Sequence, residues 1–289
     1  MADGHRLDKR ASREVTPEDV LEHLRRQYAG VFTNEAIERH LRERVGMSEA
    51  EEMLEILKMR RPDAQRILDV GCGYGSFVLA ARDAGLDAVG LELTAFELGW
   101  ARARLAEKRP TDDPSAVYVQ GDAGALPFAE GQFDAVTLWN VLEHVPDGGQ
   151  ALAEAARVLR QDGSLFVLAP NYAAIRREAH YQVPWPPLLP KPLAKLYLRA
   201  LGKDPSFFAN DVYPCTKFKT VRALKALGFE LREPRLEKVA DPSLIEHAAV
   251  REWIRRLSRL HLLGLVRLAV RAQQLNPFGQ AISFEAIKR

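Results

Sequence analysis

Closely spaced glycines beside a carboxylate give the first chemical signal in this chain. Residues 66–77 read Arg-Ile-Leu-Asp-Val-Gly-Cys-Gly-Tyr-Gly-Ser-Phe, so Asp69 is followed by Gly71, Gly73 and Gly75. An apolar run, then glycines, then a helical pattern predict a strand, a tight turn and a helix. Glycines permit unusual backbone angles there and let a ligand lie against the main chain. The pattern predicts a nucleotide-binding corner, although close packing of a helix on a strand requires the same residues.

A second acid follows the next apolar run. Residues 87–93 read as a strand that places Glu92 about 20 residues beyond the glycines, where a carboxylate can accept both hydroxyls of a ribose. The Gly-x-Gly-x-Gly spacing differs from the Gly-x-Gly-x-x-Gly pattern of dinucleotide-binding proteins. In addition, the carboxylate of Asp69, inside the strand end, would repel a pyrophosphate. The same anion suits a cationic ligand, so a nicotinamide-dependent oxidoreductase is the less favoured interpretation.

The sequence Leu-Asp-Val-Gly-Cys-Gly-Tyr-Gly resembles motif I of the class I S-adenosylmethionine-dependent methyltransferases, of the small-molecule type. The resemblance continues in order over about residues 66 to 172, through Val-Gly-Leu-Glu-Leu-Thr94, residues 119–128 and residues 133–145. It implies S-adenosylmethionine as cofactor, S-adenosylhomocysteine as product, and no metal.

The same resemblance implies which residues bind the cofactor. Asp122 would accept a hydrogen bond from the adenine amino group, and the backbone amide of Ala123 would meet the ring. Asn140 would lie at the carboxyl end of the fourth strand, facing the methionine part. Glu92 and Asp122 could also be ordinary acids that cap the turn after a strand. The full predicted cofactor set is Asp69, Gly71, Cys72, Gly73, Gly75, Glu92, Leu93, Asp122, Ala123 and Asn140.

Methyl transfer from a sulfonium needs an oriented, desolvated nucleophile more than a dedicated catalytic group. A hydroxyl acceptor would still benefit from a base. His144 is the first candidate because it follows the fourth strand, and His180, in a later insertion, is the second. His144 could equally cap or pack its loop, and O-, N- and C-methylation all remain open. The other histidines that we expect on solvated helix surfaces are His23, His40, His247 and His261.

The resemblance implies an α/β fold: a Rossmann-like, seven-stranded, mostly parallel sheet with helices on both faces and an antiparallel last strand. We expect an N-terminal helical cap over residues 1–60 and a methyltransferase domain over 61–289. Insertions are expected at about 173–214 and 241–278, the first because its proline density excludes continuous helix. The sixth strand is expected at Phe229–Val239.

Residues 16–60 predict three helices. Residues 16–19 provide an N-cap, a proline at the first helical position and an acid at the third, and residues 48–51 form a capping box. In related enzymes such a segment covers the cofactor. Tyr28 and Phe32 could reach the cavity, although packing on amphipathic helices is the favoured interpretation.

Composition sets further bounds. A net charge of +2 gives no nucleic-acid footprint, and the two cysteines, Cys72 and Cys215, are too few for a disulfide framework. Residues 1–15 lack the apolar core of a signal peptide, and apolar runs fall short of the roughly 18 residues that span a bilayer. We therefore expect a cytoplasmic protein, with peripheral contact at the inner membrane face as an option.

That option depends on residues 251–271, where Trp253 and several leucines alternate with arginines. Such a helix can lie at a membrane surface, but packing of one face on the core is favoured. With the proline-rich segment it would cover the active face, which suits a small-molecule or lipid-linked acceptor. The alternative to an enzyme is a noncatalytic cofactor-binding or membrane-associated scaffold.

Overall fold

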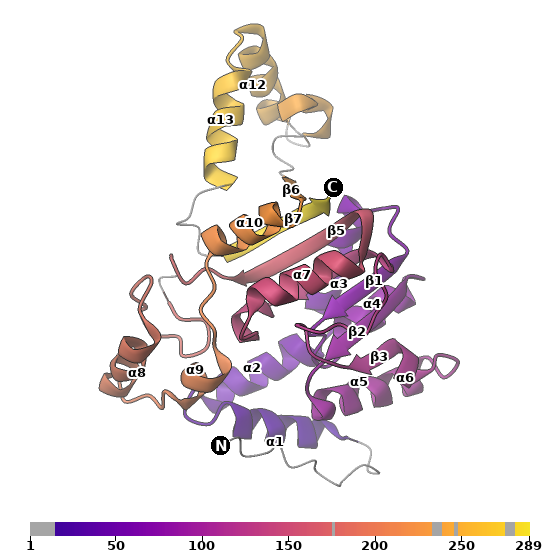
Figure 1. The fold of residues 1–289 in the computed structure, drawn as a ribbon, viewed down its shortest axis with the longest axis vertical. Coiled ribbons are helices and arrows are strands. Elements are labelled where there is room, and N and C mark those ends of the chain that lie inside the picture. The colour runs from indigo at the N-terminus through magenta and orange to yellow at the C-terminus, as the bar shows by residue number, and fades with distance from the viewer. Residues whose placement is uncertain (1–14, 175–176, 233–238, 246–247, 275–280) are drawn as a thin grey trace.

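The computed structural model describes residues 15–174, 177–232, 239–245, 248–274 and 281–289. A seven-stranded sheet with the order β3-β2-β1-β4-β5-β7-β6 organises the chain (Figure 1). The strands are β1 (Arg66–Val70), β2 (Asp87–Glu92), β3 (Tyr118–Gln120), β4 (Phe133–Trp139), β5 (Leu159–Pro170), β6 (Phe229–Arg232) and β7 (Ala281–Lys288). β7 pairs antiparallel with both β5 and β6, whereas the other pairs are parallel. This confirms the predicted fold class.

Helices cover both faces of the sheet. On one face α3 (Ser48–Arg60), α4 (Ser76–Asp83) and α5 (Ala95–Lys108) share a buried apolar cluster with β1 and β2. On the other face α7 (Gly148–Val158) and α10 (Lys217–Ala226) pack on β5 and β7. Short helices α6 (Pro114–Val117) and η1 (Leu142–His144) lie in connections. Because central strands are buried on both faces, their sequences read as apolar runs.

The register of the central strands places the predicted site at one edge of the sheet. β1 lies between β2 and β4, with Asp69 beside Gly90 on one side and Thr137 on the other. The strand order reverses here, because β1 leads by way of α4 to β2 on one side while β4 pairs on the other. Ligands bind at the carboxyl ends of parallel strands at such a switch point.

A third apolar cluster joins the start of the chain to the segment after β5. It contains side chains from α1 (Pro17–Gln27), α2 (Asn34–Val45), α8 (Lys191–Ala200) and α9 (Ser206–Asp211). Its buried aromatic side chains include Tyr28, which follows the end of α1, and Phe208 of α9. The two segments, far apart in sequence, therefore form one structure beside the sheet (Figure 1).

Local signals predicted some helix ends and missed others. Thr16 caps α1, accepting from the Asp19 amide at 3.2 Å and donating its own amide to the Asp19 carboxylate at 2.9 Å. The capping box predicted at 48–51 is wrong: α3 already includes Ser48, its N-cap is Met47, and no side chain caps it.

The C-terminal elements also differ from the prediction. β6 ends at Arg232, Val239 is helical, and residues 233–238 lie outside the described part. The stretch 251–271 forms two helices, α12 (Ala248–Arg259) and α13 (Leu263–Gln274), preceded by η2 (Pro242–Leu244). His261 has φ 56° in the turn between them, which is incompatible with a continuous helix.

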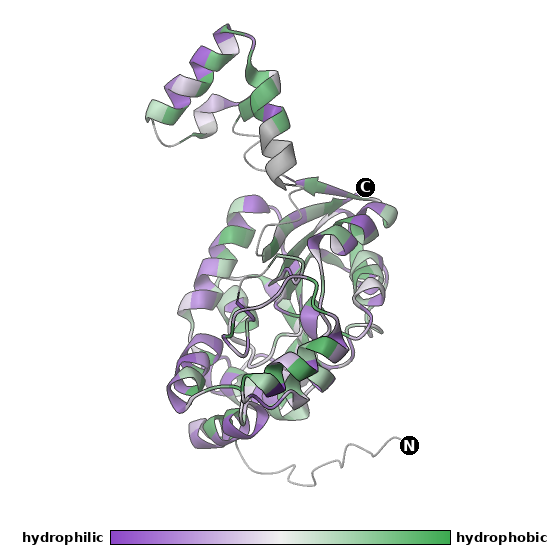
Figure 2. Ribbon diagram, turned by 90° about the vertical axis from the view of Figure 1, so that its left-hand side faces the viewer, coloured by the Kyte–Doolittle hydropathy of each residue, from purple (hydrophilic) through white to green (hydrophobic). Residues whose placement is uncertain are grey.

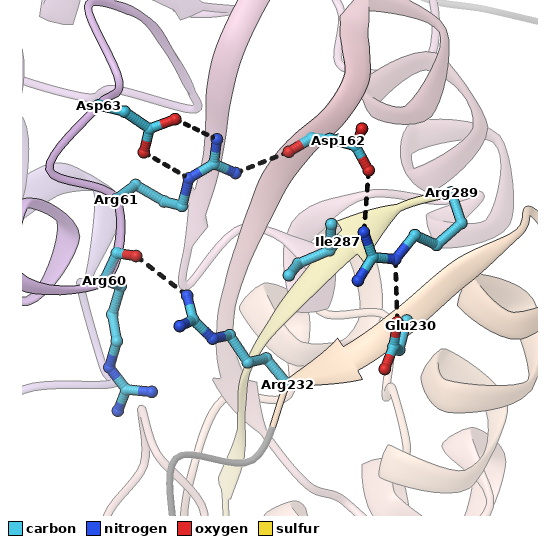
Figure 3. A pocket seen from close by; sticks show the side chains of 8 residues that line it. All are labelled: Arg60, Arg61, Asp63, Asp162, Glu230, Arg232, Ile287 and Arg289. Atoms are coloured by element: carbon cyan, nitrogen blue, oxygen red, sulfur yellow. Dashed lines mark hydrogen bonds and ion pairs between the residues drawn. The ribbon is translucent and has the colours of Figure 1, made fainter. Parts of the chain in front are cut away.

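A cavity of about 530 Å³ at the amino ends of β1 and β6 is crossed by ion pairs (Figure 3). Arg61 donates to both oxygens of Asp63, at 3.2 and 3.1 Å, and to the carbonyl of Asp162 at 2.9 Å. Arg289 bridges the carboxylates of Asp162 and Glu230, each at 2.9 Å. These bonds join the end of α3 to β5, β6 and β7, so this cavity is part of the scaffold.

Candidate active site

A second cavity, of about 550 Å³, opens at the carboxyl ends of β1, β2 and β4. Its walls come from α1, α2, α3, the glycine turn, the ends of β2 and β4, and α9. The predicted residues that line it are Asp69, Gly71, Cys72, Gly73, Glu92, Leu93, Asp122, Ala123, Asn140 and His144. Gly75 and His180 stand behind the wall. The structure thus brings together most of a set spread over 76 residues of sequence, from 69 to 144.

The three glycines of the turn have different reasons to be glycine. All have positive φ: 70° at Gly71, 51° at Gly73 and 77° at Gly75. A Cβ on Gly75 would lie 2.6 Å from the Tyr118 hydroxyl, and one on Gly71 would lie 2.6 Å from a Val141 methyl. A Cβ on Gly73 would meet nothing within 4 Å, on a residue that lines the cavity. Only Gly73 therefore offers open backbone to a ligand, whereas packing requires the other two.

Glu92 connects the glycine turn to the start of α5. One carboxylate oxygen accepts the Gly73 amide at 3.0 Å, and the other accepts the amides of Leu93 and Thr94 at 2.8 and 3.0 Å. Nearby, burial raises the pKa of Glu97 to about 8, and the negative charge of Glu92 adds to this. The pair therefore places two carboxyl groups at the position predicted for the ribose.

Asp69 is buried at the end of β1, where its carboxylate accepts the Thr137 hydroxyl at 2.6 Å. Burial raises the pKa of Asp69 to about 7, although the hydrogen bond from Thr137 opposes the shift. A cation placed nearby would favour the ionised form. The carboxyl is consequently poised to change its protonation when a positively charged ligand enters.

Asp122 and Ala123 lie beyond β3 on the cavity wall. The exposed Asp122 carboxylate accepts the Gly124 amide at 2.7 Å, so it caps its own turn. The turn-capping role exists in the ligand-free protein, and an adenine contact at this position stays a prediction.

Asn140 ends β4 in a left-handed conformation with φ 54°, which asparagine tolerates better than most residues. The backbone N–H of Asn140 donates to the Leu168 carbonyl at 2.7 Å, and this bond holds the strained residue against β5. Two neighbouring wall residues, Trp139 and Tyr74, bury the indole N–H and the phenol hydroxyl without a hydrogen-bond partner in the described part of the chain. Unpaired buried polar atoms in a cavity wall are available to a bound ligand.

The two histidines predicted as bases lie side by side, with ring centroids 5.2 Å apart. The Nδ1 of His144 lies 2.7 Å from the Asp211 carbonyl, so this nitrogen carries the proton and Nε2 is the basic one. Burial lowers the pKa of His144 to about 4, and the nearby His180 contributes in the same direction. His144 is therefore neutral at pH 7 and faces the cavity.

His180 is held from behind by a buried carboxylate. Its Nδ1 lies 3.0 Å from Glu178, which also accepts the Tyr172 hydroxyl at 2.7 Å and the Tyr181 amide at 2.6 Å. Burial opposes ionisation, yet these hydrogen bonds hold the pKa of Glu178 below its usual value. The carboxylate thus fixes the orientation of an imidazole that contacts His144.

The cap supplies residues that the sequence placed elsewhere. His40 lines the cavity 5.1 Å from Tyr28, and burial lowers its pKa to about 3, so the predicted solvated position is wrong. His23 is partly buried and stacks on Phe96 at 4.2 Å. Tyr28 lines the cavity and also stacks on Phe32, so packing and access to the cavity coexist. His261 is exposed as predicted, and His247 lies outside the described residues.

Several site residues escaped sequence reasoning. Arg44 contributes the cavity's positive charge, and Glu97 and Glu143 are buried acids in or beside its wall. Burial raises the pKa of Glu143 to about 7, and one of its oxygens has no partner within the described chain. The sequence Glu-Ala-His at 178–180 places an acid and a base close together, but the burial of these two side chains cannot be predicted from the sequence. No residue of α12 or α13 lines the cavity among those described, so the expected cover over the active face is wrong for that segment.

Two further features bear on ligands. In the described part of the chain, no three His, Cys, Asp or Glu side chains are grouped to hold a metal ion. Cys72 and Cys215 are both free thiols.

Fold and site together define a class I S-adenosylmethionine-dependent methyltransferase: the sheet order, the glycine turn, the acid after β2 and the cleft at the switch point occur together. Comparison with known proteins agrees, because the family described as "Methyltransferase domain" matches residues 68–167. The match runs from β1 into β5 and supports this class.

Individual relatives share the central part of the chain. A ubiquinone biosynthesis O-methyltransferase of Thiobacillus denitrificans is 36% identical over 169 residues, which are 58% of this chain and 66% of the relative. A demethylmenaquinone methyltransferase of Renibacterium salmoninarum is 43% identical over 103 residues, 36% of this chain and 40% of the relative. The chain therefore spans between two fifths and two thirds of the length of these relatives.

A solved structure resembles almost the whole chain. Phosphoethanolamine N-methyltransferase 2 of Haemonchus contortus, in complex with S-adenosyl-L-methionine, covers 96% of this chain and 58% of its own, with a TM-score of 0.52 and 18% identity. At this identity the likeness concerns the fold.

Proposed function

We propose that this protein transfers the methyl group of S-adenosylmethionine to a hydroxyl oxygen of a small aromatic or quinone-like acceptor. The observation that carries the proposal is His144, a neutral imidazole on the cavity wall whose Nδ1 is engaged by a backbone carbonyl. A neutral imidazole on the cavity wall, with Nδ1 engaged and Nε2 left to accept a proton, suits an acceptor that must lose one.

The residues present fit the cofactor. Gly73 offers open backbone, Glu92 lies where its carboxylate would accept hydrogen bonds from the ribose hydroxyls, and Asp69 provides an anion for the cationic methionine end. The unpaired polar atoms of Tyr74 and Trp139 add donors in the same wall. Bound cofactor supplies an electrophilic methyl group on a sulfonium.

The chain's own contribution is orientation, desolvation and removal of one proton. The acceptor oxygen forms a bond to the methyl carbon as the carbon–sulfur bond breaks, and the hydroxyl proton moves to Nε2 of His144. His180, oriented by Glu178, stands behind this base and fixes its position. The arrangement needs no metal ion in any of these steps.

Aromatic side chains support an aromatic acceptor. Tyr28, Phe207 and Tyr213 line the part of the cavity around His144, and flat aromatic surfaces favour flat ligands. The names of the relatives, a ubiquinone biosynthesis O-methyltransferase and a demethylmenaquinone methyltransferase, point to the same chemical class.

An acceptor with a lipid chain is also part of the proposal. α8 contacts the cavity helix α9 and exposes Leu193 and Leu196, by 52% and 59%. An apolar chain leaving the cavity could lie on this surface.

Incubation with methyl-labelled S-adenosylmethionine, a set of catechols and quinols, and extracted host lipids tests the proposal. We expect label on a hydroxyl oxygen of an aromatic product, in the organic phase if the acceptor carries a lipid chain. Label on nitrogen or carbon would refute O-methylation. Cofactor binding with no label transferred to any fraction would favour the noncatalytic scaffold.

A further inference from the structure

A helical projection at the β6 edge of the sheet has no part in the cavity. It consists of η2, α12 and α13, and extends away from the rest of the molecule (Figure 1). The main contacts of α12 are with η2 and α13. Its small interior contains Val239, Ile245 and Ile254, with Leu263 and Val266 packed beside them.

This interior leaves about half of the large apolar side chains described in the projection exposed. Trp253 is 55% exposed, and Leu265 and Leu268 are 64% and 65% exposed. Figure 2 shows apolar segments on the projecting helices. Among the side chains that the structure describes, the exposed large apolar ones of the projection are Val250, Trp253, Leu260, Leu262, Leu265 and Leu268. A group of this size on so short a segment indicates an interaction surface.

The exposed residues fall on defined helix faces. At 100° per residue, Val250 and Trp253 lie within about 60° of arc on α12, and Leu260 follows directly after the helix. On α13, Leu265 and Leu268 follow at the spacing of three that places residues on one face. On α13 the inward Leu263 and Val266 lie on the opposite side from this pair, whereas on α12 the buried Ile254 lies beside Val250. The turn between the helices carries Leu260 and Leu262.

The charge of the projection selects its partner. Residues 248–268 contain five arginines and one glutamate. Arg255, Arg259 and Arg267 are exposed, and the single acid, Glu252, pairs with Arg256 at 3.4 Å. A second copy of this chain would bring the same arginines face to face, because a two-fold contact repeats one surface. An anionic surface would instead neutralise them.

We propose that the α12–α13 projection docks this protein on an anionic lipid bilayer. Trp253 and the outward leucines enter the boundary between headgroups and acyl chains, and the arginines reach the lipid phosphates along their apolar stems. The docking is peripheral: within the described residues, none of the helices has the length and apolar character to cross a membrane. The surface acts independently of the methyl-transfer site.

Sedimentation of the full chain with vesicles tests the proposal. We expect binding to vesicles of phosphatidylglycerol and phosphatidylcholine, weaker binding to phosphatidylcholine alone, and release by salt. Trp253→Ser with Leu265→Ser should reduce binding at least tenfold. Arg255→Gln with Arg259→Gln should reduce it by about fivefold per arginine. All variants should keep the secondary structure of the wild type by circular dichroism.

Phe218→Ser is the matched control, because Phe218 is 67% exposed on α10, outside the projection. Its vesicle binding should equal that of the wild type. Absence of wild-type binding to anionic vesicles would overturn the proposal, as would equal losses in the control and the Trp253 variant. A dimer in sedimentation velocity that Trp253→Ser dissociates, with no vesicle binding, would instead make this surface a contact between copies.

Discussion

Replacement of Glu92 by glutamine tests the cofactor site most sharply, because it keeps the size of the side chain and removes its charge. In the structure both carboxylate oxygens accept backbone amides, from Gly73 on one side and from Leu93 and Thr94 on the other. Glutamine has one acceptor oxygen, so its amide group must face one of these donors. The glycine turn then loses its anchor, and the ribose loses a charged acceptor.

The magnitude follows from the bonds lost. A hydrogen bond to a charged group contributes about 1.5–3 kcal/mol, so S-adenosylmethionine should bind about 10- to 160-fold more weakly to Glu92→Gln. Titration calorimetry measures this below the melting temperature of the variant. Glu107→Gln, at an exposed position of helix α5, which follows Glu92 in the chain, is the control and should bind as the wild type does. Wild-type affinity in Glu92→Gln would refute the assignment of the ribose site.

The remaining predictions concern proton balance, the base and the glycine turn. Because Asp69 has a pKa of about 7 and Glu97 of about 8, both are protonated at low pH, and a cationic ligand favours their ionised forms. The affinity for S-adenosylmethionine should therefore rise between about pH 6 and 8, by about tenfold for each carboxyl group that loses its proton. Titration calorimetry in buffers of different ionisation enthalpy detects the protons released on binding. His144→Gln should lower kcat by about 10²- to 10⁴-fold in the labelling assay and leave cofactor affinity unchanged. Gly75→Ala should lower the free energy of unfolding by about 2–4 kcal/mol in urea titrations, since φ is 77° and the added Cβ would lie 2.6 Å from the Tyr118 hydroxyl.

Each of these predictions has a control. S-adenosylhomocysteine lacks the sulfonium charge, so its affinity should depend less on pH, and equal pH dependence would contradict the role of Asp69. His261→Gln removes an exposed histidine and should keep full turnover. Gly202→Ala changes a glycine with φ 69° and no neighbour within 4 Å, so it should cost about 1–2 kcal/mol. An equal cost at Gly75 would contradict the packing argument.

The parts of the fold that depend on local sequence were predictable. The strand, glycine turn and helix at 66–84 follow from a short apolar run, three glycines and a helical pattern, and the register then places Glu92 and Asn140 at one edge. The capping box predicted at 48–51 failed because Ser48 satisfies the same pattern from inside the helix, one residue after its N-cap.

The cavity wall beyond the cofactor residues was less predictable, because it depends on contacts between distant segments. His40 of α2 enters the wall only because α1 and α9 close around it, and an amphipathic pattern alone places a histidine in solvent. Glu178 is an ordinary acid in the sequence, and its burial under Tyr172 arises from the fold of the segment after β5. The position of α12 and α13 depends on how the chain leaves β6, which periodicity does not encode.

The division into an N-terminal cap and a methyltransferase domain stays a prediction, as does the cytoplasmic location. The three helices of the predicted cap do not share one environment. Helices α1 and α2 contact the insertion after β5, whereas α3 packs beside α4 on the sheet.

Diffraction from crystals grown with S-adenosylhomocysteine tests the central claim most directly. We predict the adenine beside Asp122 and Ala123, the ribose hydroxyls on Glu92, the amino acid part between Asp69 and Asn140, and the sulfur facing the side of the cavity that holds His144. Ligand bound elsewhere, or in the cleft with its sulfur turned away from His144, would contradict the account.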